Sequence, residues 1–452
     1  MKGDNSNRLK HPIVEYATMN QQRIESLGET AATKRHFHPM QHRPNRSGGS
    51  AYLPEKWLLA KILELMGSPA IRFVLWDGQE VAPSPATAVA RISIRDRDAL
   101  LKLVANPCLQ FGELYCAGRV DVEGNLVEFL ETLYQSRSRA PTGGLRQALL
   151  DWFNRPSPNS LLRAQENIHH HYDIGNDFYK LWLDPQLLYT CAYFPSESTT
   201  LEQAQVAKMD HICRKLQLKP GDQVVEAGCG WGALALHMAK HYGVRVSAYN
   251  IAKEQLAYAR ERARHEGLDG CIEYIEDDYR EIAGEFDAFV SVGMLEHVGV
   301  EHYRMLGDVI DRCLKRHGRG LIHSIGVNQP SLLNPWIERT IFPGAHPPSL
   351  GEMMNIFEPA NFSILDVENL RLHYARTLEH WLHRYEAAVP RVDEMFGESF
   401  VRAWRLYLSG SLSAFTAGEL QLFQVVFTRA ANNDIPWTRE YLYAHGRSDG
   451  KL

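Results

Sequence analysis

The segment EAGCGWGA, residues 226–233, has the residue types of a nucleotide-binding turn. It follows the expected strand QVV, and its glycines recur at Gly228, Gly230 and Gly232. Glycine tolerates positive φ and lets a ligand approach the backbone, while the helix that follows offers free N–H groups. Dinucleotide, nucleotide and methyl-donor sites all use such a loop, so the loop alone predicts only a nucleotide-like ligand.

The next strand narrows the choice of ligand. A dinucleotide site usually has an acidic residue at the end of its second strand, whereas here the strand leads into Asn250 and Ile251. The glycines also run G-x-G-x-G rather than G-x-G-x-x-G. Both features argue against a dehydrogenase and favour S-adenosylmethionine, because Glu226 can meet its cationic end while Gly228 and Gly230 leave room. A solvated charge at the strand end is the alternative for Glu226.

Asp278 and Tyr279 follow the third expected strand, where an adenine is normally held. The Asp278 carboxylate can accept a hydrogen bond from the adenine amino group, and the Tyr279 ring can lie against the adenine face. These two residues therefore complete the predicted donor site.

Cys191 lies among aromatic residues in LLYTCAYF, residues 187–194. A nucleophilic role would require a thiolate, with a base or a positive helix end beside it. Free cysteine more often behaves as a small, buried apolar residue. The residues alone leave both interpretations open.

Alternating strands and helices must position these residues. Apolar strands are expected at residues 223–227, 244–249, 272–276, 286–292 and 319–325, with amphipathic helices between them. Before the first strand, Thr199 and Glu202 form a capping-box pattern that opens a helix over 201–216, with Val206 on its inward face. This βαβ alternation predicts an α/β fold with a mostly parallel sheet covered on both faces.

The chain divides into five expected segments. A disordered basic leader, which could dock weakly on anionic surfaces or simply be solvated, is followed by a small α+β domain, a linker, a catalytic domain and a C-terminal tail. The boundaries are residues 1–50, 51–135, 136–160, 161–435 and 436–452.

The composition excludes several classes of protein. The 452 residues are 44% hydrophobic and carry a formal net charge of -5, which argues against a general nucleic-acid binder. No apolar run approaches the roughly 20 residues of a membrane span, and the N-terminus lacks the apolar core of a secretory signal. Seven cysteines without a C-x-x-C pair indicate reduced thiols and no structural metal. A cytoplasmic location is expected.

Seven stretches occur in an order that resembles one enzyme family. They are HYDIGNDFYKLWLDP (171–185), LYTCAYF (188–194), EAGCGWG (226–232), SVGMLEHVG (291–299), LIHSIG (321–326), IFPGAHPPS (341–349) and LHYARTL (372–378). Together they resemble the cyclopropane fatty acid synthases and the mycolic acid cyclopropane synthases. The similarity covers about 161–435, and the domain before it resembles the family's N-terminal lipid-associated domain.

The resemblance implies a class I methyltransferase fold, Rossmann-like, with a mostly parallel seven-stranded sheet. It also implies a cyclopropane-fatty-acyl-phospholipid synthase, which transfers the methyl group of S-adenosylmethionine to a cis double bond of an acyl chain while a bound bicarbonate removes a proton. Relatives in the family add a methyl or methylene branch without closing a ring. That product, a small-molecule methyltransferase and a non-catalytic lipid-binding protein are the alternatives.

The resemblance further implies the site residues. Glu296 and His323 would orient the bicarbonate and receive or relay its proton. The full bicarbonate set is Cys191, Glu296, His323, Ile325 and Tyr374, with backbone groups used at Cys191 and Ile325. The donor-binding set is Tyr189, Thr190, Glu226, Gly228, Gly230, Gly232, Asn250, Ile251, Gln255, Asp278 and Tyr279.

The methyl donor also changes the interpretation of Cys191, because a thiolate facing a sulfonium would itself be methylated. The segment is then better interpreted as a neutral wall, with the rings of Tyr189, Tyr193 and Phe194 toward a developing cation. The family more often has Asp, Thr and Phe where this chain has Glu226, Asn250 and Leu295, and the loss of the ring at 295 leaves the acyl specificity open.

A lipid substrate requires an apolar entrance. The segment PWIERTIFPGAHPP, residues 335–348, is the candidate, with Trp336, Ile337, Ile341 and Phe342 exposed; a buried excursion packed on the sheet is the alternative. The expected partners are therefore unsaturated phospholipid acyl chains at a membrane surface, met through transient peripheral contact. The family often forms homodimers, so a homodimer is also expected.

Overall fold

The computed structural model describes residues 53–65, 67–82, 88–137 and 174–443. The expected leader and most of the expected linker lie outside these ranges. So do residues 161–173 of the expected catalytic domain and residues 444–452 of the expected tail.

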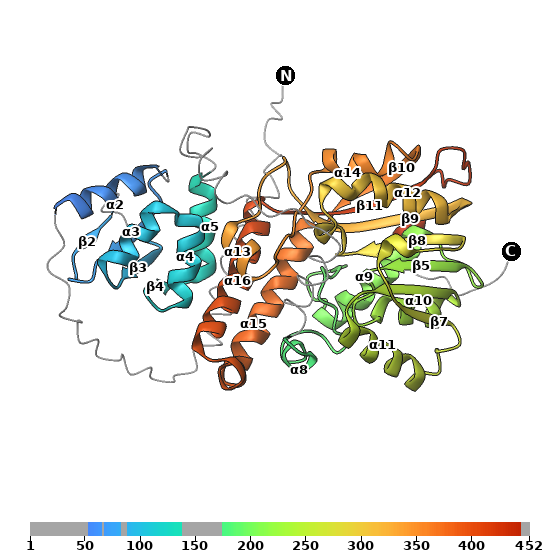
Figure 1. The fold of residues 1–452 in the computed structure, drawn as a ribbon, viewed down its shortest axis with the longest axis horizontal. Coiled ribbons are helices and arrows are strands. Elements are labelled where there is room, and N and C mark those ends of the chain that lie inside the picture. Colours follow the sequence, from blue (N-terminus) through green and yellow to red (C-terminus); the bar gives the residue numbers. More distant parts are fainter. Residues whose placement is uncertain (1–52, 66, 83–87, 138–173, 444–452) are drawn as a thin grey trace, which may run out of the picture. The chain divides into compact units, whose positions relative to one another are not determined.

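A seven-stranded sheet forms the centre of the larger part of the described chain (Figure 1). Its order is β10-β11-β9-β8-β5-β6-β7, and β11 is the one strand that runs antiparallel to its neighbours. The strands are β5 (Gln223–Ala227), β6 (Arg245–Asn250), β7 (Ile272–Glu276), β8 (Phe286–Val292), β9 (Leu314–Gly326), β10 (Phe362–Asn369) and β11 (Gln421–Arg429). The expected mostly parallel α/β sheet is thus confirmed.

Helices cover both faces of this sheet. Apolar stripes of α9 (Leu201–Leu216), α10 (Ala233–Tyr242) and α11 (Lys253–His265) pack on one face. On the other face, α12 (Tyr303–Cys313) and α14 (Leu350–Phe357) pack in the same way. Because both faces are buried, the central strands β5 and β8 are mainly apolar.

The N-terminus of α9 differs from the expectation. The capping residue is Thr200, not Thr199. Its hydroxyl oxygen accepts a hydrogen bond from the Gln203 amide, and the Gln203 side-chain oxygen accepts one from the Thr200 amide. Val206 is 45% exposed and does not belong to the inward face, whereas Met209 is buried. The rest of the expected inward face is confirmed, because Cys213 and Leu216 are buried as well.

A smaller unit precedes the larger sheet. Its four strands have the order β2-β1-β3-β4, with β1 and β3 parallel and the other pairs antiparallel. The strands are β1 (Ile71–Val74), β2 (Glu80–Val81), β3 (Ala90–Ile94) and β4 (Val120–Gly124). The helices are α2 (Leu53–Leu65), α3 (Arg97–Ala105), α4 (Pro107–Cys116) and α5 (Leu126–Arg137).

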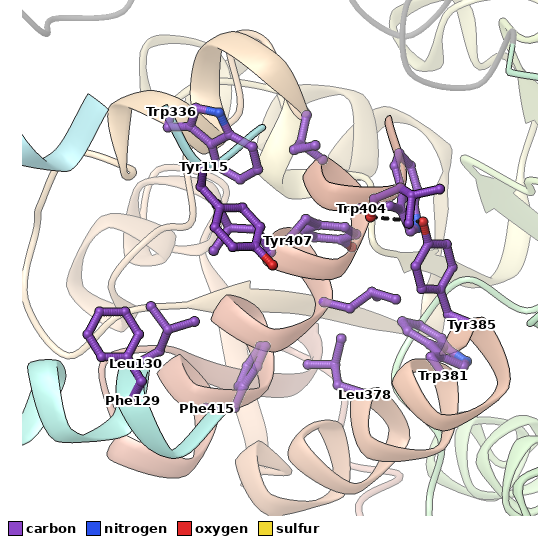
Figure 2. Close-up of a cluster of buried hydrophobic side chains, with 14 of the residues drawn as sticks. Tyr115, Phe129, Leu130, Trp336, Leu378, Trp381, Tyr385, Trp404, Tyr407 and Phe415 are labelled. Atoms are coloured by element: carbon purple, nitrogen blue, oxygen red, sulfur yellow. Dashed lines mark hydrogen bonds between the residues drawn. The ribbon is translucent and has the colours of Figure 1, made fainter. Parts of the chain in front are cut away.

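The small unit packs against two long helices, α15 (Arg371–Phe396) and α16 (Glu398–Ala417). Figure 2 shows the shared apolar cluster, in which Tyr115 of α4 and Phe129 of α5 lie with Trp404 and Phe415 of α16. Arg402 of α16 also donates to the carbonyl oxygens of Tyr115 and Val120, at 2.5 and 3.0 Å. One hydrophobic core therefore joins the two parts.

Short elements complete the described chain. They are α8 (Asn176–Tyr179), α13 (Pro335–Thr340), α17 (Glu440–Tyr443) and the 3-10 turns η1 (Tyr279–Glu281), η2 (Leu295–His297) and η3 (Val300–His302). Within the described ranges, every helix is either too short or too polar to cross a bilayer.

Gly112 of α4 provides a test of the contact between the small unit and α13. A Cβ atom added at Gly112 would overlap the indole ring of Trp336, which is buried. We expect Gly112→Ala to lower the free energy of unfolding by about 1 to 3 kcal/mol through overpacking, measured by urea denaturation. Gly410→Ala in α16 is the control, because its Cβ would lie 4.0 Å from the nearest atom and alanine favours helix. Equal effects of both substitutions would contradict this contact.

Candidate active site

The glycine turn joins β5 to α10 at the carboxyl edge of the sheet. Gly228 and Gly230 have φ of 83° and 53°, conformations that other residues rarely adopt. The amides of Gly228 and Cys229 donate to the Tyr249 carbonyl oxygen at 2.9 and 3.0 Å, which fixes the turn on β6. No atom lies within 4 Å of the position that a Cβ on Gly230 would take. The turn thus leaves space for a ligand at Gly230.

Two residues predicted to bind the donor also have packing roles. The Asn250 amide nitrogen donates to the Gly230 carbonyl oxygen at 3.3 Å and to the Gln255 side chain at 2.9 Å, which ties the turn to α11. Gly232 does not line the cavity; a Cβ there would come 2.8 Å from the Ala259 Cβ. Gly232 is required for close packing of α10 on α11 rather than for space around a ligand.

A single cavity brings most of the predicted residues together. Of the predicted donor-binding residues, those that line it are Tyr189, Thr190, Glu226, Gly228, Gly230, Asn250, Ile251, Gln255, Asp278 and Tyr279. Of the predicted bicarbonate set, Glu296, His323, Ile325 and Tyr374 line it, and Cys191 does not.

Glu226 is the buried acidic group at the donor end of the cavity. It is 2% exposed, and its Oε2 atom has no hydrogen-bond partner in the described structure. Burial raises the pKa of Glu226 to about 8, and the nearby Lys208 ammonium opposes that rise. Because the group is buried rather than solvated, an ammonium brought by a ligand would stabilise its charged form. An amino-acid end of S-adenosylmethionine fits this requirement.

Asp278 and Tyr279 are the residues predicted to bind the adenine. The Asp278 carboxylate caps η1 by accepting from the Arg280 amide at 3.0 Å. Tyr279 is buried, and its hydroxyl has no partner among the described residues. Both side chains line the cavity.

Glu296 is held by the backbone of β9. Its Oε1 atom accepts from the Ile325 amide at 2.6 Å, while its Oε2 atom is buried without a partner in the described part of the chain. Burial raises the pKa of Glu296 to about 7. The Ile325 amide, expected to hold an anion directly, instead positions Glu296. The carboxyl group is thereby left able to donate as well as accept near neutral pH.

His323 is oriented by Gln424, which pattern analysis of the sequence missed. The two residues are paired across β9 and β11, and the Gln424 amide nitrogen lies 3.0 Å from His323 Nδ1. Burial lowers the pKa of His323 well below its usual value, so the ring is neutral. With the amide donating to Nδ1, the proton is on Nε2, an atom with no partner among the described residues.

Cys191 is buried with its thiol turned to backbone groups. Its Sγ atom lies 3.2 Å from the Ala192 carbonyl oxygen, and burial raises the thiol pKa. Thr377 and His373 of α15 accept from the Ala192 and Phe194 amides, both at 3.0 Å. The protonated, enclosed thiol supports the interpretation of this segment as a neutral wall.

Two aromatic rings of this wall lie away from the cavity, contrary to the expectation. Tyr193 stacks on His211 and His373, with ring centroids 4.3 and 4.9 Å apart. Phe194 stacks on His380 at 5.6 Å. Only Tyr189 of the three rings lines the cavity.

The far end of the cavity is apolar. Its lining includes Leu333, Ile337, Phe342, Leu378, Tyr407, Phe415, Leu420 and Leu422. The Tyr189 and Tyr407 hydroxyls are 2.6 Å apart and satisfy each other in this wall. The expected exposed entrance at 335–348 is wrong for Trp336 and Ile341, which are 4% and 3% exposed. Trp336 packs on α4 instead, while Ile337 and Phe342 face the cavity.

The described side chains do not form a metal site. No group of three or more His, Cys, Asp or Glu side chains within the described ranges is arranged to hold a metal ion.

Comparison with known proteins agrees with this geometry. The family model described as mycolic acid cyclopropane synthetase matches residues 159–425, and a model described only as a domain of unknown function matches residues 58–142. The chain is 34% identical over 391 residues to a probable fatty acid methyltransferase of Pseudomonas putida, which covers 82% of this chain and 96% of that protein.

Two further similarities concern the larger part of the chain. It is 43% identical over 266 residues to the cyclopropane-fatty-acyl-phospholipid synthase of Escherichia coli, covering 59% of this chain and 68% of the relative. The crystal structure of a mycolic acid cyclopropane synthase complexed with SAH and CTAB superposes with a TM-score of 0.57 at 28% identity, covering 60% of this chain and 99% of that chain.

The buried Glu296 carboxyl makes stability depend on pH. Its pKa rises on folding from 4.5 to about 7, so folding favours the protonated form, and this contribution is lost as pH rises through that window. We expect Glu296→Gln to gain about 2 to 3 kcal/mol relative to the wild type between pH 5 and pH 8, measured by urea unfolding. The exposed Glu301→Gln is the control and should show no such gain; a pH-independent difference for Glu296→Gln would contradict the buried charge.

Proposed function

Because the chain belongs to the mycolic acid cyclopropane synthetase family of S-adenosylmethionine-dependent methyltransferases, we propose that it is a cyclopropane-fatty-acyl-phospholipid synthase. Its substrate is a cis double bond in the acyl chain of a phospholipid, reached through peripheral contact with a membrane. The homodimer stays a prediction.

One observation carries the proposal: a single cavity is lined both by the buried ionisable groups Glu226, Glu296 and His323 and by many apolar side chains. Among the ionisable groups, Glu226 offers an unpartnered oxygen beside the glycine turn. The apolar side chains, among them Leu333, Ile337 and Leu422, provide a surface suited to an acyl chain. A small polar methyl acceptor would not cover that apolar surface.

S-adenosylmethionine, when bound, supplies an electrophilic methyl group. Glu226 would hold its cationic amino-acid end, with Gly228 and Gly230 admitting it to the backbone. The π electrons of the double bond form the new carbon–carbon bond as the carbon–sulfur bond breaks, which leaves a cation on the neighbouring alkene carbon. Loss of a proton from the transferred methyl group then closes the ring.

The residues around this reaction must take up a proton without trapping the cation. Glu296 and His323 each present an unpartnered polar atom toward the cavity, and Tyr374 lines the same wall. Bicarbonate fits between such groups, since the neutral His323 Nε2–H can donate to the anion while an ionised Glu296 can accept from its O–H group. In this role the anion would be the base, and the two side chains would orient it and take its proton onward.

A methylene-branched product is the second candidate. It is favoured by the similarity to the probable fatty acid methyltransferase, which extends over 82% of this chain. The two products have equal mass, because both add one CH₂ group. Incubation with labelled S-adenosylmethionine and mixed unsaturated phospholipids, followed by proton NMR of the released fatty acids, separates ring protons from alkene protons. Label found only in water-soluble products would contradict both candidates.

Glu296→Gln tests the proposed proton path. We expect loss of ring formation, because the amide cannot take up a proton, with S-adenosylmethionine binding largely retained. Product is measured by mass spectrometry and binding by calorimetry, with Glu301→Gln as the control. If Glu296→Gln kept the activity of the wild type, the proposed role of Glu296 in proton transfer would be wrong.

Cys191→Ser tests the neutral wall. The thiol is buried and protonated, so replacing it by a hydroxyl should reduce activity through altered packing but not abolish it. Complete loss of turnover, in a variant with an unchanged melting temperature, would instead indicate direct participation of the thiol.

A further inference from the structure

Lys208 is a buried cation in the wall of the cavity. It lies on α9, is 1% exposed and lines the cavity together with Glu226 and Thr190. Burying an ammonium costs free energy unless an acceptor or an opposite charge compensates it. The groups around Lys208 therefore show what could compensate its charge.

The ammonium of Lys208 donates a hydrogen bond to one acceptor among the described residues, the Thr190 hydroxyl oxygen at 2.8 Å. An ammonium has three donors, so two are left for another acceptor. The Thr190 hydroxyl accepts this bond through its oxygen, and its own proton is therefore free to donate elsewhere. Two donors of different kinds thus meet at one point of the cavity wall.

The neighbouring segment is held firmly in this position. Gln205, one turn before Lys208 on α9, donates to the carbonyl oxygens of Leu188 and Thr190 at 3.2 and 3.0 Å. The Thr190 side chain is also confined by Gly293, where an added Cβ would come 3.1 Å from the Thr190 methyl group. The hydroxyl is thereby presented to the cavity with little freedom.

The nearby acidic groups do not neutralise Lys208 by contact. The buried Asp184 carboxylate accepts from the Gln186 and Leu188 amides at 2.9 and 3.0 Å, and no ion pair joins it to Lys208 in the described structure. Glu226 keeps an unpartnered oxygen. The cavity therefore has a cation and an anion at one end, each short of a partner.

We propose that Lys208 and Thr190 bind the α-carboxylate of S-adenosylmethionine while Glu226 binds its α-ammonium. The assignment of Glu226 rests on the proposed function; the assignment of Lys208 adds the anion half of the site. An amino-acid end carries both charges, so its two groups complement the two buried side chains in a single binding event.

The electrostatics of the cavity agree with this role. Burial lowers the pKa of Lys208 to about 8, with Asp184, Cys191 and Glu226 opposing that shift. Burial raises the pKa of Glu226 to about 8 as well. A zwitterionic ligand stabilises the ammonium of one residue and the carboxylate of the other together, so it restores the charged forms that burial disfavours.

Decarboxylated S-adenosylmethionine provides the test, because it lacks only the α-carboxylate. Calorimetry would compare its affinity with that of S-adenosylmethionine for the wild type, Lys208→Met and Thr190→Val. We expect Lys208→Met to weaken S-adenosylmethionine binding about 10- to 100-fold and to leave the affinity for the decarboxylated compound unchanged. Thr190→Val keeps the side-chain volume. It should lower the affinity for S-adenosylmethionine, relative to that for the decarboxylated compound, by less than Lys208→Met does.

Lys215→Met is the matched control. Lys215 is equally buried on the same helix, but it pairs with Glu368 at 2.6 Å and does not line the cavity. Its replacement should leave the ratio of the two affinities unchanged, whatever it does to stability. If Lys208→Met weakened the binding of both ligands equally, the proposal would be overturned. It would also be overturned if neither Lys208→Met nor Thr190→Val changed the ratio of the two affinities.

Bicarbonate is the other carboxylate-type anion that Lys208 could face. A Lys208→Met enzyme that needs more bicarbonate for turnover, with an unchanged ratio of donor affinities, would place bicarbonate at Lys208 and overturn the proposal. Failure of the wild type to bind S-adenosylmethionine at all would instead contradict the proposed function.

Discussion

The burial of opposite charges in one cavity is the constraint on which the site depends. Glu226 lies near the carboxyl end of β5, Glu296 follows the adjacent parallel strand β8, and both are nearly inaccessible to solvent. Lys208 adds a buried cation to the same cavity. Such groups cost free energy when they are left unpaired, and the two covered faces of the sheet provide the apolar burial that offsets the cost. The site is therefore prepared for charged ligands that bring the missing partners.

The wall opposite the glycine turn is built from an extended segment without regular secondary structure. Residues 188–194 are held on one side by Gln205 and Lys208 of α9 and on the other by His373 and Thr377 of α15. Side-chain bonds to the backbone take the place of a sheet ladder here. This arrangement encloses the Cys191 thiol and presents Tyr189 and Thr190 to the cavity.

The small N-terminal unit contributes to the same cavity indirectly. Its helix α4 receives Trp336 of α13 at Gly112, and the neighbouring Ile337 and Phe342 line the apolar end. The segment once expected to be an exposed entrance thus connects the two parts of the chain. Because Trp336 is fixed against α4, the position of the apolar wall depends on how the small unit packs.

The amino-acid sequence by itself determined the alternation of strands and helices, the glycine turn and the order of the family motifs. These features are local, since they depend on side-chain periodicity and on the φ angles that glycine permits. The strands 223–227, 272–276 and 286–292 follow directly from such patterns. Most predicted donor-binding residues lie in or beside these elements, and so they reach one cavity.

Only the tertiary structure decided which polar atoms meet. Gln424 lies 101 positions from His323 along the chain, and the β9–β11 register alone brings their side chains together. Likewise, a lysine on an amphipathic helix is ordinarily exposed, and the packing of α9 on the segment 188–190 is what buries Lys208 beside Thr190. Contacts between distant segments depend on sheet register and helix packing, and no local pattern specifies either of them.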